Sequence, residues 1–115
     1  MKTTEMKQRR LGPDGPQVSV VGYGSMSFSD FYGPATDEGS MAILDACVDL
    51  GITHVDTADA YGGGRAETVI GNWLKARGGE APFTIATKVG ITSDPDQRLK
   101  NDPAHMQAAL EASLK

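Results

Sequence analysis

The sequence predicts an α/β protein in which strands and helices alternate and the strands pair in parallel. Three observations predict this fold class. Strand-like apolar segments begin at intervals of roughly 30 to 35 residues, the length of one β-α-β unit, and segments with apolar residues at helical spacing separate them. Loops rich in glycine, aromatic and polar residues follow the strand-like segments, as at the ligand-binding ends of α/β sheets. The period alone fits the start of either a doubly wound sheet or an eight-stranded barrel.

The first elements are expected to be a hairpin, a strand and a helix. Pro13-Asp14-Gly15 is a turn sequence between two short segments, which predicts a small β-hairpin. A strand follows over residues 18–24. Thr36 or Asp37 can cap the next helix, and Gly51 ends it. Apolar residues recur along one face of that helix, at Met41, Leu44, Cys47 and Val48.

The second and third units repeat this pattern. A strand over residues 52–58 leads through a glycine-rich loop to a helix that Gly78 and Gly79 end. The apolar stripe of that helix consists of Val69, Ile70, Trp73 and Leu74. A third strand over residues 83–89 precedes a helix that Asp102 caps, with Pro103 in its first turn. Met106, Leu110 and Leu114 share one face of this last helix.

Composition restricts the location and the partners of the protein. A net charge of -4 and a pI near 5.0 argue against a general nucleic-acid binder, which needs a basic face. The first residues lack the apolar core of a secretory signal, and no run approaches the ~20 apolar residues of a membrane span, so we expect a cytoplasmic protein without membrane contact. The single Cys47 supplies neither a disulfide framework nor a zinc site, and its place in a helical pattern predicts a small core residue.

Three polar side chains are expected to meet at one rim of the sheet. Because side chains alternate along a strand, Asp56 and Lys88 should face the same side near the ends of neighbouring strands, with Tyr61 in the loop after Asp56. A lysine among apolar strand residues is costly to bury without a carboxylate partner. The pair alone fits a structural ion pair as well as a catalytic one. Tyr61 favours catalysis, since a phenol of ordinary pKa, about 10, needs help to donate a proton at neutral pH.

Five segments carry a more specific pattern: residues 22–26, 50–62 with the motif Asp-Thr-Ala-x-x-Tyr-Gly, 67–74, 84–90 and 110–115. In order and spacing they resemble the N-terminal part of the aldo-keto reductases, a family of NAD(P)H-dependent (β/α)8-barrel enzymes. The resemblance spans nearly the whole chain. It implies that residues 1–115 form a partial TIM barrel of about three βα units behind a short hairpin, which ends before the fourth strand.

The resemblance also implies a role for each rim residue. Tyr61 would be the general acid that protonates a substrate carbonyl oxygen as hydride arrives from the nicotinamide. Lys88 would favour the phenolate form of Tyr61, and Asp56 would keep Lys88 charged and in place while lying near the cofactor ribose. The cofactor would be NADPH, or alternatively NADH. The segment that lies against the cofactor matches Gly24, Ser25 and Met26.

Two parts of the family's site have no match in this sequence. The fourth catalytic residue, a histidine at the end of the next strand, would follow Lys115, and so would the site for the adenine-side phosphate. His54 is instead expected in the barrel interior, and His105 is expected to be solvated in the first turn of the last helix. Because a barrel needs about 250 residues, we expect the chain to be part of a longer reductase and to be inactive alone.

The implied function is reduction of an aldehyde or ketone, a small-molecule substrate, to an alcohol. A non-catalytic regulatory or interaction subunit on the same scaffold is the alternative. A Rossmann fingerprint is disfavoured because Ser27 stands at its third glycine position, and the glycines at 62–64, which could cradle an anion, lack the Walker lysine and are expected to form a flexible loop. Aromatic residues after the first strand would either line a substrate pocket or cover the barrel top; they are Phe28, Phe31 and Tyr32.

Overall fold

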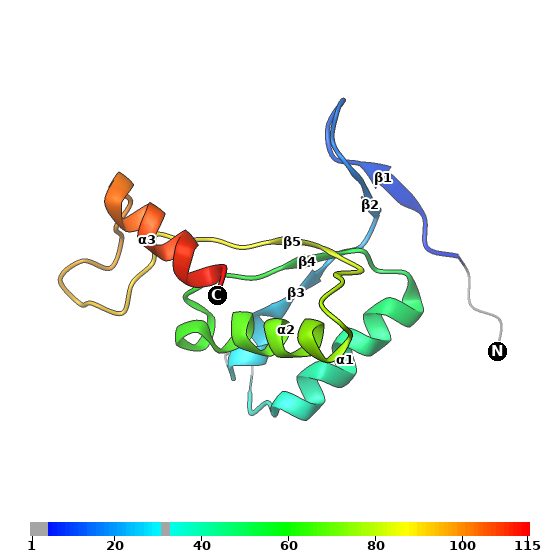
Figure 1. Ribbon diagram of the computed structural model, residues 1–115, viewed down its shortest axis with the longest axis horizontal. Helices are drawn as coiled ribbons and strands as arrows, with labels where there is room; N and C mark the ends of the chain where they lie inside the picture. The colour runs from blue at the N-terminus through cyan, green and yellow to red at the C-terminus, as the bar shows by residue number, and fades with distance from the viewer. Residues whose placement is uncertain (1–4, 31–32) are drawn as a thin grey trace.

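The computed structural model describes residues 5–30 and 33–115 (Figure 1). The interpretation of Phe31 and Tyr32 as pocket or cover residues lies outside these described residues. The chain begins with the predicted hairpin, in which β1 (Gln8–Arg10) pairs antiparallel with β2 (Gln17–Ser19). Figure 1 shows this hairpin projecting from one end of the molecule, at the opposite end from the last helix.

The predicted first strand over residues 18–24 is wrong as a single element, because the structure divides it in two. Its start belongs to β2 of the hairpin, and its end forms β3 (Tyr23–Gly24) in a separate sheet. The Ser19 hydroxyl donates to the carbonyl of Val21 at 2.6 Å, and the Ser19 backbone N–H donates to the Thr53 hydroxyl at 2.8 Å. These bonds bend the chain between the two strands and anchor the bend to the next unit.

The second sheet is parallel, as the spacing of the units predicts. Its order is β3, then β4 (His54–Asp56), then β5 (Thr84–Ala86). The second and third strands are shorter than the predicted ranges 52–58 and 83–89. Beyond β4 and β5 single backbone bonds continue the pairing, from Thr57 N–H to the Ala86 carbonyl at 2.8 Å and from Asp59 N–H to the Lys88 carbonyl at 3.1 Å. Among the described residues this sheet is open, so it does not close into a barrel.

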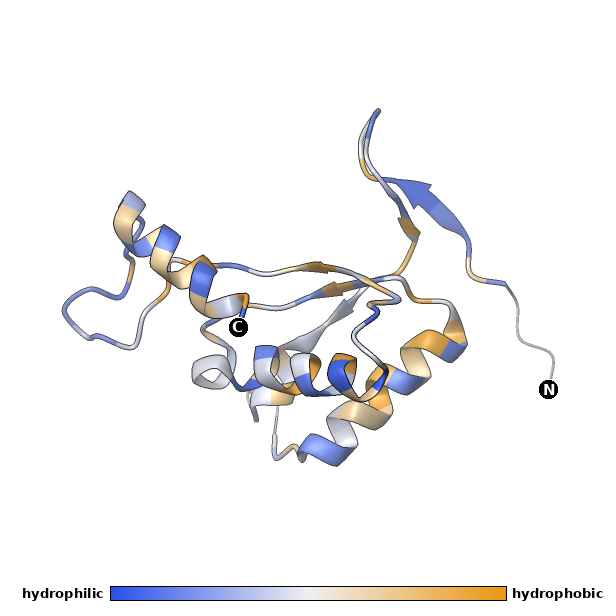
Figure 2. Cartoon of the chain, viewed as in Figure 1, coloured by the Kyte–Doolittle hydropathy of each residue, from blue (hydrophilic) through white to orange (hydrophobic). Residues whose placement is uncertain are grey.

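The first two helices lie side by side and cover the sheet (Figure 1). Helix α1 (Asp37–Leu50) has the predicted boundaries: the Thr36 side chain accepts from the Gly39 N–H at 3.0 Å, and Gly51 ends the helix at φ 82°. Helix α2 (Arg65–Ala76) begins after a short 3-10 turn, η2 (Tyr61–Gly64). The apolar faces of both helices turn inward (Figure 2). The buried core comprises Phe28, Leu44, Cys47, Val55, Ala66, Val69, Ile70, Trp73 and Phe83.

The core agrees with the predicted helix faces and with the role of Cys47. The Trp73 ring stacks on Phe83 with 5.3 Å between centroids, and its indole N–H donates to Asp45 at 2.9 Å. Burial raises the pKa of the Cys47 thiol, which makes it a poor nucleophile at neutral pH. Cys47 is therefore a small core residue, as predicted.

Helix α3 (Pro103–Ser113) forms where predicted but does not bury its apolar face. The Asp102 side chain caps it by accepting from the His105 N–H at 3.2 Å. The face predicted from spacing remains exposed, with Leu110 at 50% and Leu114 at 77% relative accessibility. None of the helices formed by residues 5–30 and 33–115 combines the length and the apolar character that a membrane span requires.

Candidate active site

The three predicted side chains meet at the carboxyl end of the parallel sheet. The Lys88 ammonium donates to Asp56 Oδ2 at 2.6 Å and lies 3.1 Å from the Tyr61 hydroxyl oxygen. Its third contact is the Thr57 carbonyl at 2.9 Å. An ammonium group has three donors, so all three are used. The Thr57 carbonyl was not predicted, because a backbone acceptor leaves no trace in residue identity.

The contacts of Lys88 change its ionisation. Partial burial lowers the pKa of Lys88, but the hydrogen bonds to Asp56 and Tyr61 and their charges outweigh this effect, so the pKa is raised above its ordinary value. Lys88 is therefore a cation throughout the neutral range. A cation that is hydrogen-bonded to a phenol oxygen stabilises the phenolate relative to the phenol.

The ion pair of Lys88 and Asp56 supplies the carboxylate partner that the sequence predicts, but it is exposed. The Lys88 side chain is 50% exposed, and that of Asp56 is 43% exposed. Lys88 lies just beyond β5, where the open sheet leaves one side of the rim uncovered. An ion pair with this exposure contributes about 0 to 1 kcal/mol to folding. A large contribution to folding stability therefore does not account for the presence of the Lys88–Asp56 ion pair.

The residues predicted to lie against a cofactor occupy the same rim. Gly24 pairs with Asp56 in the parallel register of β3 and β4. Ser25 and Met26 begin the 3-10 turn η1 (Ser25–Ser29), and the fully buried Ser25 donates from its hydroxyl to the Asp56 carbonyl at 3.0 Å. This bond fixes the first loop to the backbone of Asp56. This bond could not be predicted from the sequence, because serine is common in loops for many reasons.

Gly24 gives a test of whether the rim suits a bound cofactor. Its φ of -97° and ψ of 125° are ordinary extended values that any residue adopts, so the backbone does not require glycine. A Cβ built at Gly24 would meet no atom within 4 Å among the described residues. The missing side chain leaves open space on the strand position that pairs with Asp56, whose carboxylate oxygens can accept from the hydroxyls of a ribose. The acceptor oxygens of Asp56 and the open space at Gly24 fit the hydroxyl-bearing ribose of a nucleotide cofactor.

Tyr61 is held by close packing between two loops. It begins η2 and contacts the core. Gly62, next in sequence, has φ 65°, and a Cβ there would lie 2.9 Å from the Ser29 Cβ. The glycine therefore lets η2 approach η1, which carries Ser25 and Met26. For Gly62 the structure thus shows a packing role in place of the expected flexible loop.

The two histidines lie apart from this cluster, as predicted. His54 is half-buried in β4, and its Nδ1 is buried with no hydrogen-bond partner in the described part of the chain. His105 lies in the first turn of α3. Neither donates to nor accepts from Asp56, Tyr61 or Lys88 within the residues that the structure describes.

Fold and rim together define a class: parallel βα units that carry a carboxylate, a lysine and a phenol at the carboxyl ends of their strands. Comparisons with known proteins identify the family. Residues 20–115 match the model of the Aldo/keto reductase family. The chain belongs to that family.

Individual relatives agree with this assignment. The chain is similar to the NADP(+) aldo-keto reductase yakc of Schizosaccharomyces pombe, with 37% identity over 93% of this chain and 32% of that protein. It is 32% identical to Probable aldo-keto reductase 1 of Glycine max, over 100% of this chain and 34% of that protein. Among solved structures it is similar to an aldo-keto reductase from Bacillus halodurans in its holo form, with 34% identity and a TM-score of 0.76 over 96% of this chain and 36% of that one.

These similarities settle the choice between the two architectures that periodicity left open. The structural neighbours are (β/α)8 barrels, so the three parallel units correspond to part of such a barrel and not to a doubly wound sheet. The chain spans about a third of the length of the curated relatives that it matches.

Proposed function

We propose that the complete protein reduces an aldehyde or ketone to an alcohol with NADPH, or with NADH in its place. The observation that carries the proposal is the position of Lys88 Nζ, within hydrogen-bond distance of both Asp56 and Tyr61. Family membership and the similarity to a reductase named for NADP(+) support the reaction class and the preferred cofactor. The substrate would be a small carbonyl compound.

Each side chain has a separate role in this proposal. Tyr61 is the general acid and donates its hydroxyl proton to the carbonyl oxygen. Lys88 stabilises the phenolate that remains, because it is a cation 3.1 Å from that oxygen. Asp56 balances the charge of Lys88 and directs its ammonium group through the 2.6 Å hydrogen bond.

The cofactor would lie along the rim formed by Gly24, Ser25, Met26 and Asp56. Gly24 leaves room beside Asp56, and Ser25 holds the loop against the Asp56 backbone. When bound, the cofactor supplies the hydride that is added to the carbonyl carbon. Asp56 is well placed to accept hydrogen bonds from ribose hydroxyls while one of its oxygens holds Lys88.

We also propose that residues 1–115 are a partial domain that precedes the fourth strand of a complete barrel. The open edge of β5 and the exposed face of α3 support this view, because further βα units would cover both. Enclosure of the rim would lower its effective dielectric and strengthen the contacts of Lys88. The isolated chain should then lack carbonyl-reducing activity.

The test uses two substitutions in the complete protein. Tyr61→Phe and Lys88→Met should each lower kcat by about 100-fold or more while the melting temperature stays close to that of the parent. NADPH oxidation with an aromatic aldehyde measures the rate, and cofactor fluorescence measures binding. Parent-like turnover in Tyr61→Phe would reject the proposed function. Tight partner binding by a parent protein that has no turnover would favour the non-catalytic alternative.

A further inference from the structure

In the described part of the chain, the strand that leads to Lys88 is paired on its β4 side. β5 is the last strand of the described sheet, and the bonds from Thr57 and Asp59 reach it from the β4 side. They fix the distance between the two strands. A rotation of the segment about its own axis would leave that spacing unchanged but would swing the Lys88 side chain away from Tyr61.

A side-chain bond on the opposite face opposes that rotation. Because side chains alternate along an extended segment, Thr87 and Lys88 point in opposite directions. The Thr87 hydroxyl donates to Glu67 Oε2 of α2 at 2.8 Å. Lys88 is therefore directed toward Asp56 and Tyr61 while its neighbour is held against a helix that belongs to the packed core.

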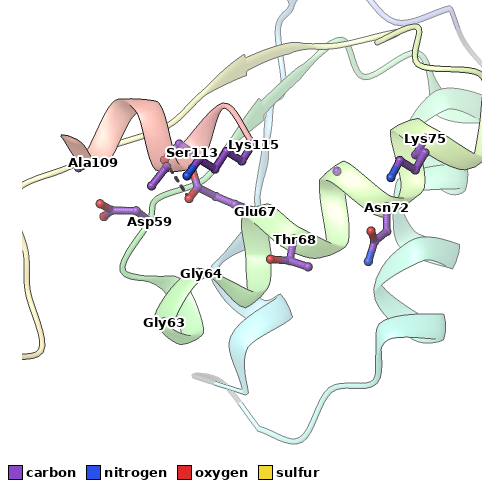
Figure 3. A pocket seen from close by; sticks show the side chains of 12 residues that line it. Asp59, Gly63, Gly64, Glu67, Thr68, Asn72, Lys75, Ala109, Ser113 and Lys115 are labelled. Atoms are coloured by element: carbon purple, nitrogen blue, oxygen red, sulfur yellow. Dashed lines mark hydrogen bonds between the residues drawn. The ribbon is translucent and has the colours of Figure 1, made fainter. Parts of the chain in front are cut away.

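Glu67 makes a second bond that serves as an internal comparison. Its other oxygen, Oε1, accepts from the Ser113 hydroxyl of α3 at 3.1 Å (Figure 3). Both bonds use the same carboxylate, but only the first reaches the neighbour of Lys88. The two contacts can therefore be removed separately.

The charge of Glu67 has a local cost. Burial and the negative charge of Glu67 raise the pKa of Asp59, whose Oδ1 is buried without a hydrogen-bond partner among the described residues. Figure 3 shows Asp59 and Glu67 lining the same pocket, beside the start of α2 and the end of α3. A contact that merely joined α2 to α3 could use a neutral side chain. A carboxylate forms a stronger hydrogen bond with the Thr87 hydroxyl than a neutral acceptor does.

We propose that Glu67 is a positioning residue that orients Lys88 through Thr87. The contacts form a continuous chain. Glu67 accepts from the Thr87 hydroxyl, and Thr87 is joined by one peptide unit to Lys88, whose ammonium group is hydrogen-bonded to the Tyr61 hydroxyl. The inference rests on the proposed role of Lys88 beside Tyr61. It adds a residue on α2, outside the rim, that determines how well the rim is aligned.

The experiment compares three substitutions in the complete protein. Thr87→Val removes the hydroxyl with little change of shape, Thr87→Ser retains it, and Ser113→Ala removes the other bond of the same carboxylate. Thr87→Val should lower kcat by about 5- to 10-fold with little change in KM, because alignment and not substrate binding is lost. Thr87→Ser should recover most of that loss, and Ser113→Ala should change kcat by less than about twofold.

A second measurement reports on the rim without turnover. The ε-methylene NMR signal of Lys88, assigned by its loss in Lys88→Met, should titrate at a lower pH in Thr87→Val, because the bonds to Asp56 and Tyr61 that raise the pKa of Lys88 are weakened. In Ser113→Ala it should titrate at the parent pH. Equal effects of Thr87→Val and Ser113→Ala on both kcat and the titration would overturn the proposal. A Thr87→Val variant with the kcat and titration of the parent would also overturn it. If Tyr61→Phe retains turnover, the proposed function fails, while the titration still decides whether Thr87 orients Lys88. Urea unfolding followed by Trp73 fluorescence checks that each variant is folded. Glu67→Gln keeps one acceptor oxygen, so its kcat should lie between those of the parent and of Thr87→Val.

Discussion

Helices α2 and α3 carry similar apolar patterns but have different surroundings. The stripe of α2 is almost completely inaccessible, with Val69 at 1% and Trp73 at 3%. The face of α3 has the same kind of spacing, yet Leu110 remains half exposed. Helices α1 and α2 pack against each other and contribute to the buried core, whereas α3 lies beside the open edge of the sheet (Figure 1). Helical spacing thus predicts that a helix forms and which face is apolar, while burial depends on a partner elsewhere in the fold.

The candidate active site lies at the boundary between these two regions. Asp56 and Tyr61 belong to the well-packed part, through β4 and η2. Lys88 follows β5, the strand at the open edge. The bonds of Glu67 to Thr87 and Ser113 connect the two regions. Substitutions that separate the contributions of the regions are therefore the most informative.

The largest contrast should come from equal truncations in the two helical regions. Leu44 of α1 is fully buried, and Leu110 of α3 is half exposed. Leu44→Ala should lower the free energy of unfolding by about 2 to 5 kcal/mol, because it removes buried contacts and leaves a cavity. In residues 1–115 alone, where the α3 face is uncovered, Leu110→Ala should lower it by about 0.5 kcal/mol. Urea unfolding followed by Trp73 fluorescence measures both, and comparable losses would mean that α3 is packed as tightly as α1.

The same contrast explains how much of the fold could be predicted. The caps at Thr36 and Asp102 and the stop at Gly51 are local signals, and the structure has them where the sequence predicts. The division of the first strand was missed, because it depends on bonds between Ser19 and Thr53, which lie 34 positions apart. The exposure of the α3 face was also missed, since no local pattern reports whether a covering element is present.

In the site, too, the features that follow from local pattern could be predicted, and those that depend on distant parts of the chain could not. Strand alternation and parallel pairing brought Asp56 and Lys88 together, and the structure has this contact. The exposure of Lys88 could not be predicted from its apolar neighbours in sequence, because it depends on the open edge of the sheet. The bond between Glu67 and Thr87 was missed, because neither its 20-residue separation nor its residue types mark it as a contact.

A comparison of two neighbouring glycines should sharpen the role of the well-packed side of the rim. Gly62 and Gly63 have nearly the same backbone, at φ 65° and 64°, so alanine strains both alike, at about 1 kcal/mol. A Cβ at Gly62 would also clash with Ser29, whereas one at Gly63 would meet nothing within 4 Å among the described residues. Gly62→Ala should therefore destabilise by about 1 to 3 kcal/mol more than Gly63→Ala. It should also lower kcat further, because Tyr61 is displaced. Chemical unfolding measures the effect on stability, and aldehyde reduction measures the effect on kcat. Equal stability and equal kcat in the two variants would show that close packing of η1 and η2 is not required for folding or for activity.

The smallest effect concerns Asp59, where the two regions meet. Burial and, to a lesser extent, the charge of Glu67 raise the pKa of this carboxyl in the folded state, so the folded protein binds its proton more tightly than the unfolded chain does. The contribution of Asp59 to stability therefore falls as pH rises through the interval between the unfolded and folded pKa values, and the ionised group remains unfavourable at neutral pH. Asp59→Asn cannot ionise. It should melt at a slightly higher temperature than the parent at neutral pH, and the difference should vanish well below the ordinary aspartate pKa of about 3.9, where the parent carboxyl is protonated in both states. Thermal melts across this range decide the point: a difference between the two proteins that does not change with pH would show that the substitution acts through packing or hydrogen bonding and not through charge.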